Sequence, residues 1–110
     1  IVAGVTIASL EALTGTKRLV RVMPNTPALV GEGMSCIAAS AAVAEEDLAA
    51  VETLLSSVGL CRRVGENQLD AVTGLSGSGP AFVLEFIMAL SAVVSAAERS
   101  AELGALAAKK

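Results

Sequence analysis

Between Ala81 and Ala97 the chain carries a single charged residue, Glu85. Pro80 stands at the head of this run, and proline is tolerated in the first turn of a helix because the N–H it lacks has no helical partner there. We therefore predict one long helix from about Pro80 to Leu103. Such a helix is apolar on every side, which is typical of a helix that is buried on all its faces.

A membrane or a protein partner would bury such a helix. A membrane span needs roughly 20 apolar residues, and Ser91, Ser95 and Glu85 make this run a poor one. We interpret it as a helix covered in an oligomer, which agrees with a composition of 54% hydrophobic and 17% charged residues. A small membrane-associated helix protein is the weaker alternative, and partition into the soluble fraction without detergent would exclude it.

The charged and metal-ligating residues argue against two other classes of protein. The net charge is −3, the eight Lys and Arg residues form no basic stripe, and the aromatic residues are Phe82 and Phe86, so nucleic-acid binding is not expected. The sequence has no histidine, and Cys36 and Cys61 are too few to hold zinc. We expect no metal site and two buried, reduced thiols.

Strand and helix patterns alternate over residues 1–64, which is typical of a parallel α/β sheet. Thr6 is a suitable N-cap and Gly15 a suitable stop for the first helix. Gly59 is expected to close the second helix as its C′ residue. The expected elements are the end of a strand at Ile1–Ala3, a helix at Val5–Leu13, strands at Leu19–Met23, Met34–Ala39 and Leu60–Val64, and a helix from Glu45 to Val58.

The character of the chain changes near Gly65, where we place a domain boundary. A short helix, Gln68–Val72, is expected next, followed by a loop at Thr73–Pro80 and then the long helix. The strongest local signal is Ser76-Gly77-Ser78-Gly79-Pro80 before that helix. Small residues let a ligand approach the backbone, and free N–H groups at a helix start favour a carboxylate or phosphate. A tight turn packed against another helix explains the same residues equally well.

A second signal, Met23-Pro24-Asn25-Thr26-Pro27, directly follows a predicted strand. Ligands of open α/β sheets bind beyond the carboxyl ends of the strands, and Asn25 offers both a donor and an acceptor. An ordinary turn fixed by proline is the simpler interpretation. Ala3 and Gly4 are a weaker signal of the same kind. Glu66, near a helix start, and the run Glu45–Asp47 read most simply as solvated acids that favour the helix dipole.

Taken together, these segments resemble the pyrroline-5-carboxylate reductase family. One hallmark is Arg21–Pro27 followed by Glu32-Gly33, and the other is Asp70–Ala81, which is long and highly specific. Ala3-Gly4-Val5, Leu54–Gly59 and Glu66 fall at the intervals expected between them. The resemblance covers about residues 1–90.

The resemblance implies the second half of a Rossmann-type parallel sheet in residues 1–64. Residues 65–110 would begin an all-α dimerisation domain, with a tail outside the family pattern from about Ala92. It also implies a homo-oligomer formed through the helix near residues 80–103, with no membrane or nucleic-acid partner. A cytoplasmic location is expected, or a mitochondrial one in a eukaryote.

The implied reaction transfers hydride from NADPH or NADH to the C=N carbon of 1-pyrroline-5-carboxylate, giving L-proline. By resemblance, the cofactor contacts Ala3, Gly4, Met23, Asn25 and Thr26. The substrate contacts Glu66, Ser76, Gly77, Ser78 and Gly79. Glu66 and Thr73 are the expected catalytic residues, Glu66 by stabilising the protonated imine.

Two family segments are absent from this sequence: the Gly-rich fingerprint that holds the pyrophosphate, and a later Ser-Pro-Gly-Gly segment that completes the substrate pocket. We therefore expect this chain to be inactive alone, as an incomplete portion of a reductase. The alternative is a non-catalytic oligomerisation piece that docks through its long apolar helix. A dimer that binds no NADPH would favour that alternative.

Overall fold

The computed structural model describes residues 1–108 and divides into two compact units between Pro80 and Ala81. Most of the elements expected from the sequence are present. In chain order they are α1 (Ile7–Thr14), β1 (Val20–Met23), the 3₁₀ helix η1 (Thr26–Val30), β2 (Gly33–Ala39), α2 (Glu45–Ser56), β3 (Gly59–Arg63), the 3₁₀ helix η2 (Glu66–Gln68), α3 (Leu69–Val72), the π-helical turn η3 (Thr73–Gly77) and α4 (Gly79–Ala107).

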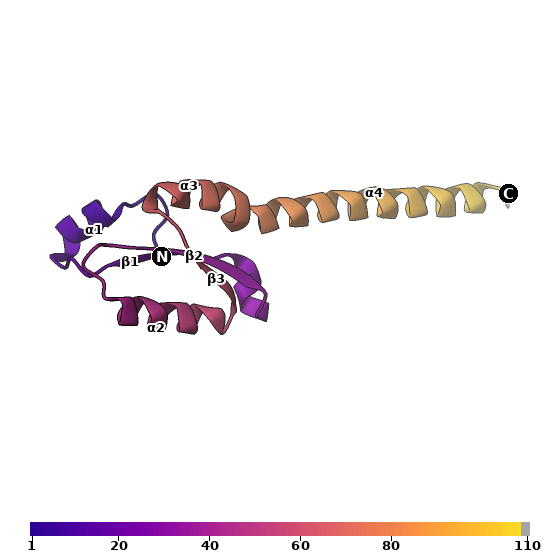
Figure 1. Cartoon of the computed structure of the whole chain (residues 1–110). Helices are drawn as coiled ribbons and strands as arrows, with labels where there is room; N and C mark the ends of the chain where they lie inside the picture. Colours follow the sequence, from indigo (N-terminus) through magenta and orange to yellow (C-terminus); the bar gives the residue numbers. More distant parts are fainter. Residues whose placement is uncertain (109–110) are drawn as a thin grey trace. The chain divides into compact units, whose positions relative to one another are not determined.

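The three strands form one sheet in the order β1-β2-β3, with α2 on one face and α3 on the other (Figure 1). The predicted α/β class is thereby confirmed. The sheet is mixed, however: β1 pairs with β2 antiparallel and β2 with β3 parallel. Only Pro24–Glu32 joins β1 to β2, and a parallel crossover needs a dozen or more residues. The connection from β2 to β3 contains α2 and is long enough for one.

The first helix follows the sequence signals closely. The Thr6 hydroxyl accepts a hydrogen bond from the backbone N–H of Ser9. Gly15 ends the helix in the left-handed conformation, with φ of 72°.

The strand end predicted at Ile1–Ala3 is wrong, because the structure has no strand there. These residues are exposed and pair with no strand in the part of the chain that the structure describes, and a strand needs a ladder partner.

The second helix ends differently from the prediction. Ser57 is its C-cap, in the right-handed helical region, and Gly59 already belongs to β3. The acids of its first turn are also more than solvated residues. Glu45 forms an ion pair with Arg63, and Asp47 with Arg18.

The loop predicted at Thr73–Pro80 is wrong, because helical structure runs through most of it. The backbone N–H of Ser78 donates to the carbonyl of Thr73 at 2.9 Å, which is the i→i−5 bond of a π-helix. The side chains also bond to helical carbonyls, Thr73 to Leu69 at 2.8 Å and Ser78 to Thr73 at 3.0 Å. The small polar residues therefore widen one turn of a helix instead of ending it.

A small core joins the sheet to the helical segment after Gly65. Met23, Cys36, Ala38 and Leu69 form its buried cluster, and Leu69 is 1% exposed. Met34, Val64 and Val72 pack against this cluster. Both cysteines are free, and Cys61 is only partly buried. Leu69 therefore anchors α3 to β1 and β2.

Considered by itself, α4 is a long helix with exposed apolar side chains. By length and composition, the helical run Glu66–Ala105 is apolar enough to cross a membrane. Core helices of soluble proteins meet the same criterion, so it does not separate the two environments. The large exposed side chains in α4 are Phe82, Val83, Leu84, Phe86, Ile87, Met88, Leu90, Val93, Val94 and Leu103.

The parallel pairing of β2 and β3 depends on two glycines that lie against each other. Gly33 and Gly59 are register partners. A Cβ atom on Gly59 would lie 2.1 Å from the carbonyl oxygen of Gly33, and the φ of Gly59 is 144°. No side chain fits this crossing without moving the backbone.

We predict that Gly59→Ala lowers the free energy of unfolding by about 3 kcal/mol, because it adds a backbone clash to a forbidden φ. Gly104→Ala is the matched control. A Cβ at Gly104 meets nothing within 4 Å, so this change should raise stability by about 0.8 kcal/mol through helix propensity. Urea denaturation followed by circular dichroism measures both. Equal stabilities for Gly59→Ala and the wild type would contradict the account.

Candidate functional site

Asn25 connects the turn after β1 with the helical segment that follows α3. Its Nδ2 donates to the carbonyl oxygen of Ser76 at 3.1 Å, and its Oδ1 accepts from the backbone N–H of Met34 at 2.8 Å. The two partners lie 51 and 9 residues from Asn25 in the sequence. The two sequence signals around Asn25 and Ser76, which the resemblance assigned to the cofactor and the substrate, therefore lie side by side.

An open depression of about 370 Å³ lies where these two segments meet. Asn25, Thr26 and Gly77 contribute to its wall, so predicted cofactor and substrate residues share it. The other lining residues are Pro24, Ala28 and Leu29. The lining is mostly apolar, and Gly77 has no side chain of its own, so a ligand could approach its backbone.

Glu66 lies in a second depression, of about 470 Å³. Its Oε1 accepts hydrogen bonds from the backbone N–H of Ile7 at 2.5 Å and from the guanidinium of Arg21 at 2.9 Å. Arg21 is buried in β1, whereas Glu66 is partly exposed. The depression is lined by Gly4, Thr6, Arg21, Glu66, Asn67 and Asp70.

The hydrogen bond from Ile7 and the charge of Arg21 both lower the pKa of Glu66 below its ordinary value of 4.5. Glu66 therefore stays ionised at neutral pH. It satisfies the otherwise free N–H at the start of α1 and neutralises a buried arginine. The sequence analysis interpreted Glu66 most simply as a solvated acid, and that interpretation missed both of these contacts.

The two depressions share no lining residue. Glu66 and Ser76 are ten positions apart along continuous helical structure, which corresponds to about 15 Å. Gly4 lies with Glu66, and Asn25 and Thr26 lie with Gly77. The structure thus brings together part of the predicted cofactor and substrate sets, but it does not bring Glu66 to the Ser76–Gly79 segment.

The remaining predicted site residues lie elsewhere. Ala3 is exposed, next to Gly4. The Met23 side chain belongs to the core, so only its main chain is left to meet a cofactor. Thr73 uses its hydroxyl proton in the bond to Leu69. Ser76 and Ser78 also bond to helical carbonyls, at 3.3 and 3.0 Å.

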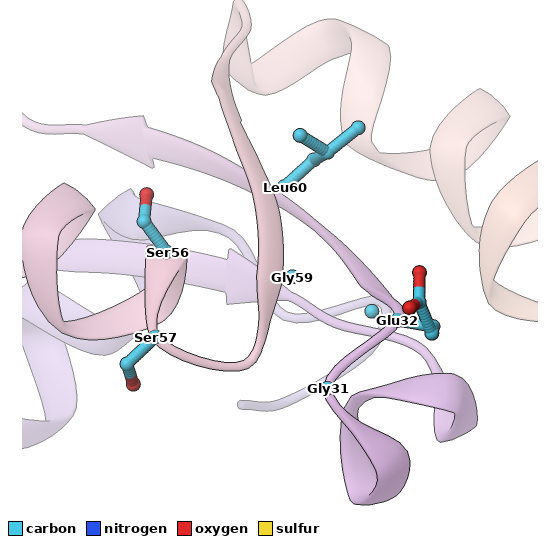
Figure 2. Close-up of a pocket in the computed structure, with 7 residues that line it drawn as sticks. Gly31, Glu32, Ser56, Ser57, Gly59 and Leu60 are labelled. Atoms are coloured by element: carbon cyan, nitrogen blue, oxygen red, sulfur yellow. The ribbon is translucent and has the colours of Figure 1, made fainter.

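A third depression, of about 320 Å³, lies at the amino ends of β2 and β3. Figure 2 shows Ser56 and Ser57 at the end of α2 on one side, and Gly31 and Glu32 from the turn before β2 on the other. The hydroxyl of Ser57 donates to the carbonyl of Leu54 at 2.7 Å. None of the predicted cofactor or substrate residues lines this depression.

Arg21 lines the depression that contains Glu66, and the sequence analysis did not predict its contact with Glu66. A signal was available, because Arg21 is the one charge within an apolar strand and a buried charge needs a partner. The partner, Glu66, lies 45 residues further on, and no local pattern could identify it.

Comparison with known proteins gives a consistent result. A family model described as "Pyrroline-5-carboxylate reductase dimerisation" matches residues 66–109. The pyrroline-5-carboxylate reductase of Arabidopsis thaliana is 45% identical over 91 residues, which is 83% of this chain and 33% of the relative. That of Aquifex aeolicus is 47% identical over 92 residues, 83% of this chain and 35% of the relative.

Solved structures agree with the sequence matches. The 1-pyrroline-5-carboxylate reductase of Streptococcus pyogenes superposes with a TM-score of 0.81 at 32% identity, over 84% of this chain and 36% of that one. The Plasmodium falciparum pyrroline carboxylate reductase with NADP bound gives 0.74 at 39% identity, over 79% and 35%.

The chain is homologous to a part of the pyrroline-5-carboxylate reductases. The family resemblance read from the two motifs is thereby confirmed. An α/β sheet followed by a long helix agrees with the solved reductases. The chain spans about a third of the length of the reductases it matches. The division of function between residues 1–64 and 65–110 stays a prediction.

The ion pair at Glu66 predicts a pH dependence of stability. A carboxylate whose pKa is lower in the folded state than in the unfolded state stabilises the fold at every pH above its unfolded pKa, which is about 4.5 here. That contribution is lost as the pH falls through the lower folded value. Between pH 7 and pH 3 the wild type should therefore lose more stability than Glu66→Gln.

Thermal unfolding at several pH values measures this difference. Glu98→Gln is the control, because it also removes one negative charge, from an exposed carboxylate inside α4 that forms no ion pair among residues 1–108. The Glu98 variant should follow the wild-type profile. A Glu66 variant that also follows it would show that the pair does not affect stability.

Proposed function

We propose that this chain supplies part of the active site of a reductase that uses NADPH or NADH to convert 1-pyrroline-5-carboxylate to L-proline. The observation that carries this proposal is the hydrogen bond from Asn25 to Ser76. It joins the two family motifs at one depression. The names of the relatives, and the NADP bound to the Plasmodium falciparum structure, supply the substrate and cofactor class.

The described residues fit the nicotinamide end of such a cofactor. Pro24, Ala28 and Leu29 provide an apolar wall, and Thr26 provides a hydroxyl beside it. A reduced nicotinamide supplies the hydride. The chain's own contribution is to hold the ring and to exclude water from one of its faces, which places the reacting carbon.

On the substrate side we propose the Thr73–Gly79 segment, with Gly77 nearest the depression. The absence of side chains at Gly77 and Gly79 lets a small cyclic imine approach the backbone. Thr73 is the proposed catalytic hydroxyl of this segment. Its bond to Leu69 fixes the orientation of the side chain and leaves the oxygen lone pairs as acceptors.

Glu66 keeps its predicted role beside the protonated imine as a separate proposal. One of its oxygens already binds Ile7 and Arg21. These contacts support an anchoring role as well. The two roles differ in their effect on turnover, so variants of an active enzyme can separate them.

Grafting residues 1–90 into the Aquifex aeolicus reductase, in place of the matching segment, tests the proposed reaction. We expect the chimera to reduce 1-pyrroline-5-carboxylate with NADPH or NADH at a rate within about tenfold of the parent enzyme. The consumption of the reduced cofactor, followed by absorbance, measures this. A folded chimera of native oligomeric state with no activity would contradict the proposal.

The same chimera separates the two roles of Glu66. A direct role predicts that Glu66→Gln lowers turnover on the order of a hundredfold, while Arg21→Met, which leaves the carboxylate in place, lowers it much less. Equal losses in the two variants would support anchoring alone. Unchanged turnover and substrate affinity in Glu66→Gln would refute the direct role.

A second candidate function is oligomerisation without catalysis. Two observations favour it: the dimerisation model matches residues 66–109, and α4 exposes large apolar side chains that include Phe82 and Phe86. We propose a second copy of the chain as the partner that covers this helix.

The cytoplasmic location expected from the family resemblance stays a prediction.

Phe86→Glu should convert the soluble oligomer of this chain to a monomer, because it places a charge in the apolar surface that a partner must bury. Light scattering measures the mass. Glu102→Gln, at an exposed position of the same helix, is the control and should leave the mass unchanged. An oligomer that persists in Phe86→Glu, or a wild type that requires detergent to stay in solution, would count against this partner.

A further inference from the structure

Pro80 leaves one carbonyl of the helical segment without its ordinary partner. In an α-helix the N–H of residue 80 would donate to the carbonyl of residue 76, four positions earlier. Proline has no N–H. The carbonyl of Ser76 must therefore find another donor or remain without one in a partly buried place, which costs free energy.

The missing donor comes from a distant segment. Asn25 Nδ2 donates to the Ser76 carbonyl oxygen at 3.1 Å. The other end of the same carboxamide accepts from the N–H of Met34 at 2.8 Å. The two partners fix which end of the carboxamide is which, because Met34 N–H can only donate and Ser76 C=O can only accept.

The bridged carbonyl belongs to the widened turn. Ser76 lies within η3, where the i→i−5 bond from Ser78 to Thr73 opens the helix. The next residue, Gly77, lines the depression beside Asn25. π-helical turns inside α-helices are frequent at functional sites, but they are less favourable than regular helix and need support.

We propose that Asn25 is a positioning residue, whose carboxamide replaces the hydrogen bond that Pro80 cannot make and thereby holds the η3 turn at the depression. This role differs from the direct cofactor contact that the family resemblance implies for Asn25. It acts through the backbone of Ser76, so it places Gly77 and the rest of the Thr73–Gly79 segment. Its bearing on the reaction rests on the proposed function, whereas the hydrogen-bond exchange itself does not.

A double-mutant cycle on the full 110-residue chain tests whether the Asn25 carboxamide replaces the hydrogen bond that Pro80 cannot make. Asn25→Asp keeps an acceptor for Met34 but removes the donor to Ser76. Pro80→Ala gives the helix its own N–H for the same carbonyl. We expect Asn25→Asp to lower the folding equilibrium constant about tenfold in the wild-type chain, but only about threefold or less when Pro80→Ala is also present.

Urea denaturation of the wild type, the two single variants and the double variant measures the coupling free energy between positions 25 and 80. An equal loss from Asn25→Asp with and without Pro80→Ala would overturn the proposal, because a residue with a general structural role gains nothing from a new N–H at position 80. Asn67→Asp makes the same chemical change at an exposed position. It should show no coupling to Pro80→Ala.

Amide hydrogen exchange under native conditions provides a second readout, which holds for variants too unstable for denaturation. The Met34 amide should stay protected in Asn25→Asp and exchange faster in Asn25→Ala, since only the alanine removes the acceptor. The amides of Ser78, Gly79 and Ala81 should exchange faster in both variants and recover when Pro80→Ala is added to Asn25→Asp. Failure of that recovery would also overturn the proposal. Because no step involves a cofactor or the imine, these outcomes are independent of the activity of the chimera.

Discussion

The hydrogen bonds of the Asn25 carboxamide determine where the two family motifs lie relative to each other. One side chain satisfies the N–H at the start of β2 and a carbonyl in the helical segment. Each bond is worth only about 1 kcal/mol net. Without them, however, the turn after β1 and the Ser76–Gly77 backbone would lose the contact that makes them one site.

The sheet and core provide the frame for that contact. The short connection after β1 makes it antiparallel to β2, and this brings the end of β1 back to the start of β2, where Asn25 meets Met34. Gly33 and Gly59 permit β2 and β3 to pair at their first residues. Leu69 fixes α3 against the sheet. The site therefore depends on backbone geometry more than on exposed reactive side chains.

Local signals in the sequence predicted the elements that local chemistry determines. Thr6 and Gly15 marked the ends of α1, and Pro24 marked the end of β1. The sequence failed where a distant or cooperative interaction decides the outcome. Glycine and serine at 76–79 are typical of a loop, yet hydroxyl-to-carbonyl bonds and the contact from Asn25 keep them helical. The pairing of Arg21 with Glu66 was equally invisible to a local pattern.

The family resemblance assigned one segment to the cofactor and the other to the substrate, although it could not show which atoms join the two segments. The scalar coupling across the hydrogen bond, between the Asn25 side-chain amide nitrogen and the Ser76 carbonyl carbon, tests this contact most directly. The account predicts a detectable coupling in a uniformly labelled chain, because Asn25 Nδ2 donates to the Ser76 carbonyl oxygen. A folded chain with both signals assigned, in which backbone hydrogen bonds of similar length give couplings and this pair gives none, would contradict the account.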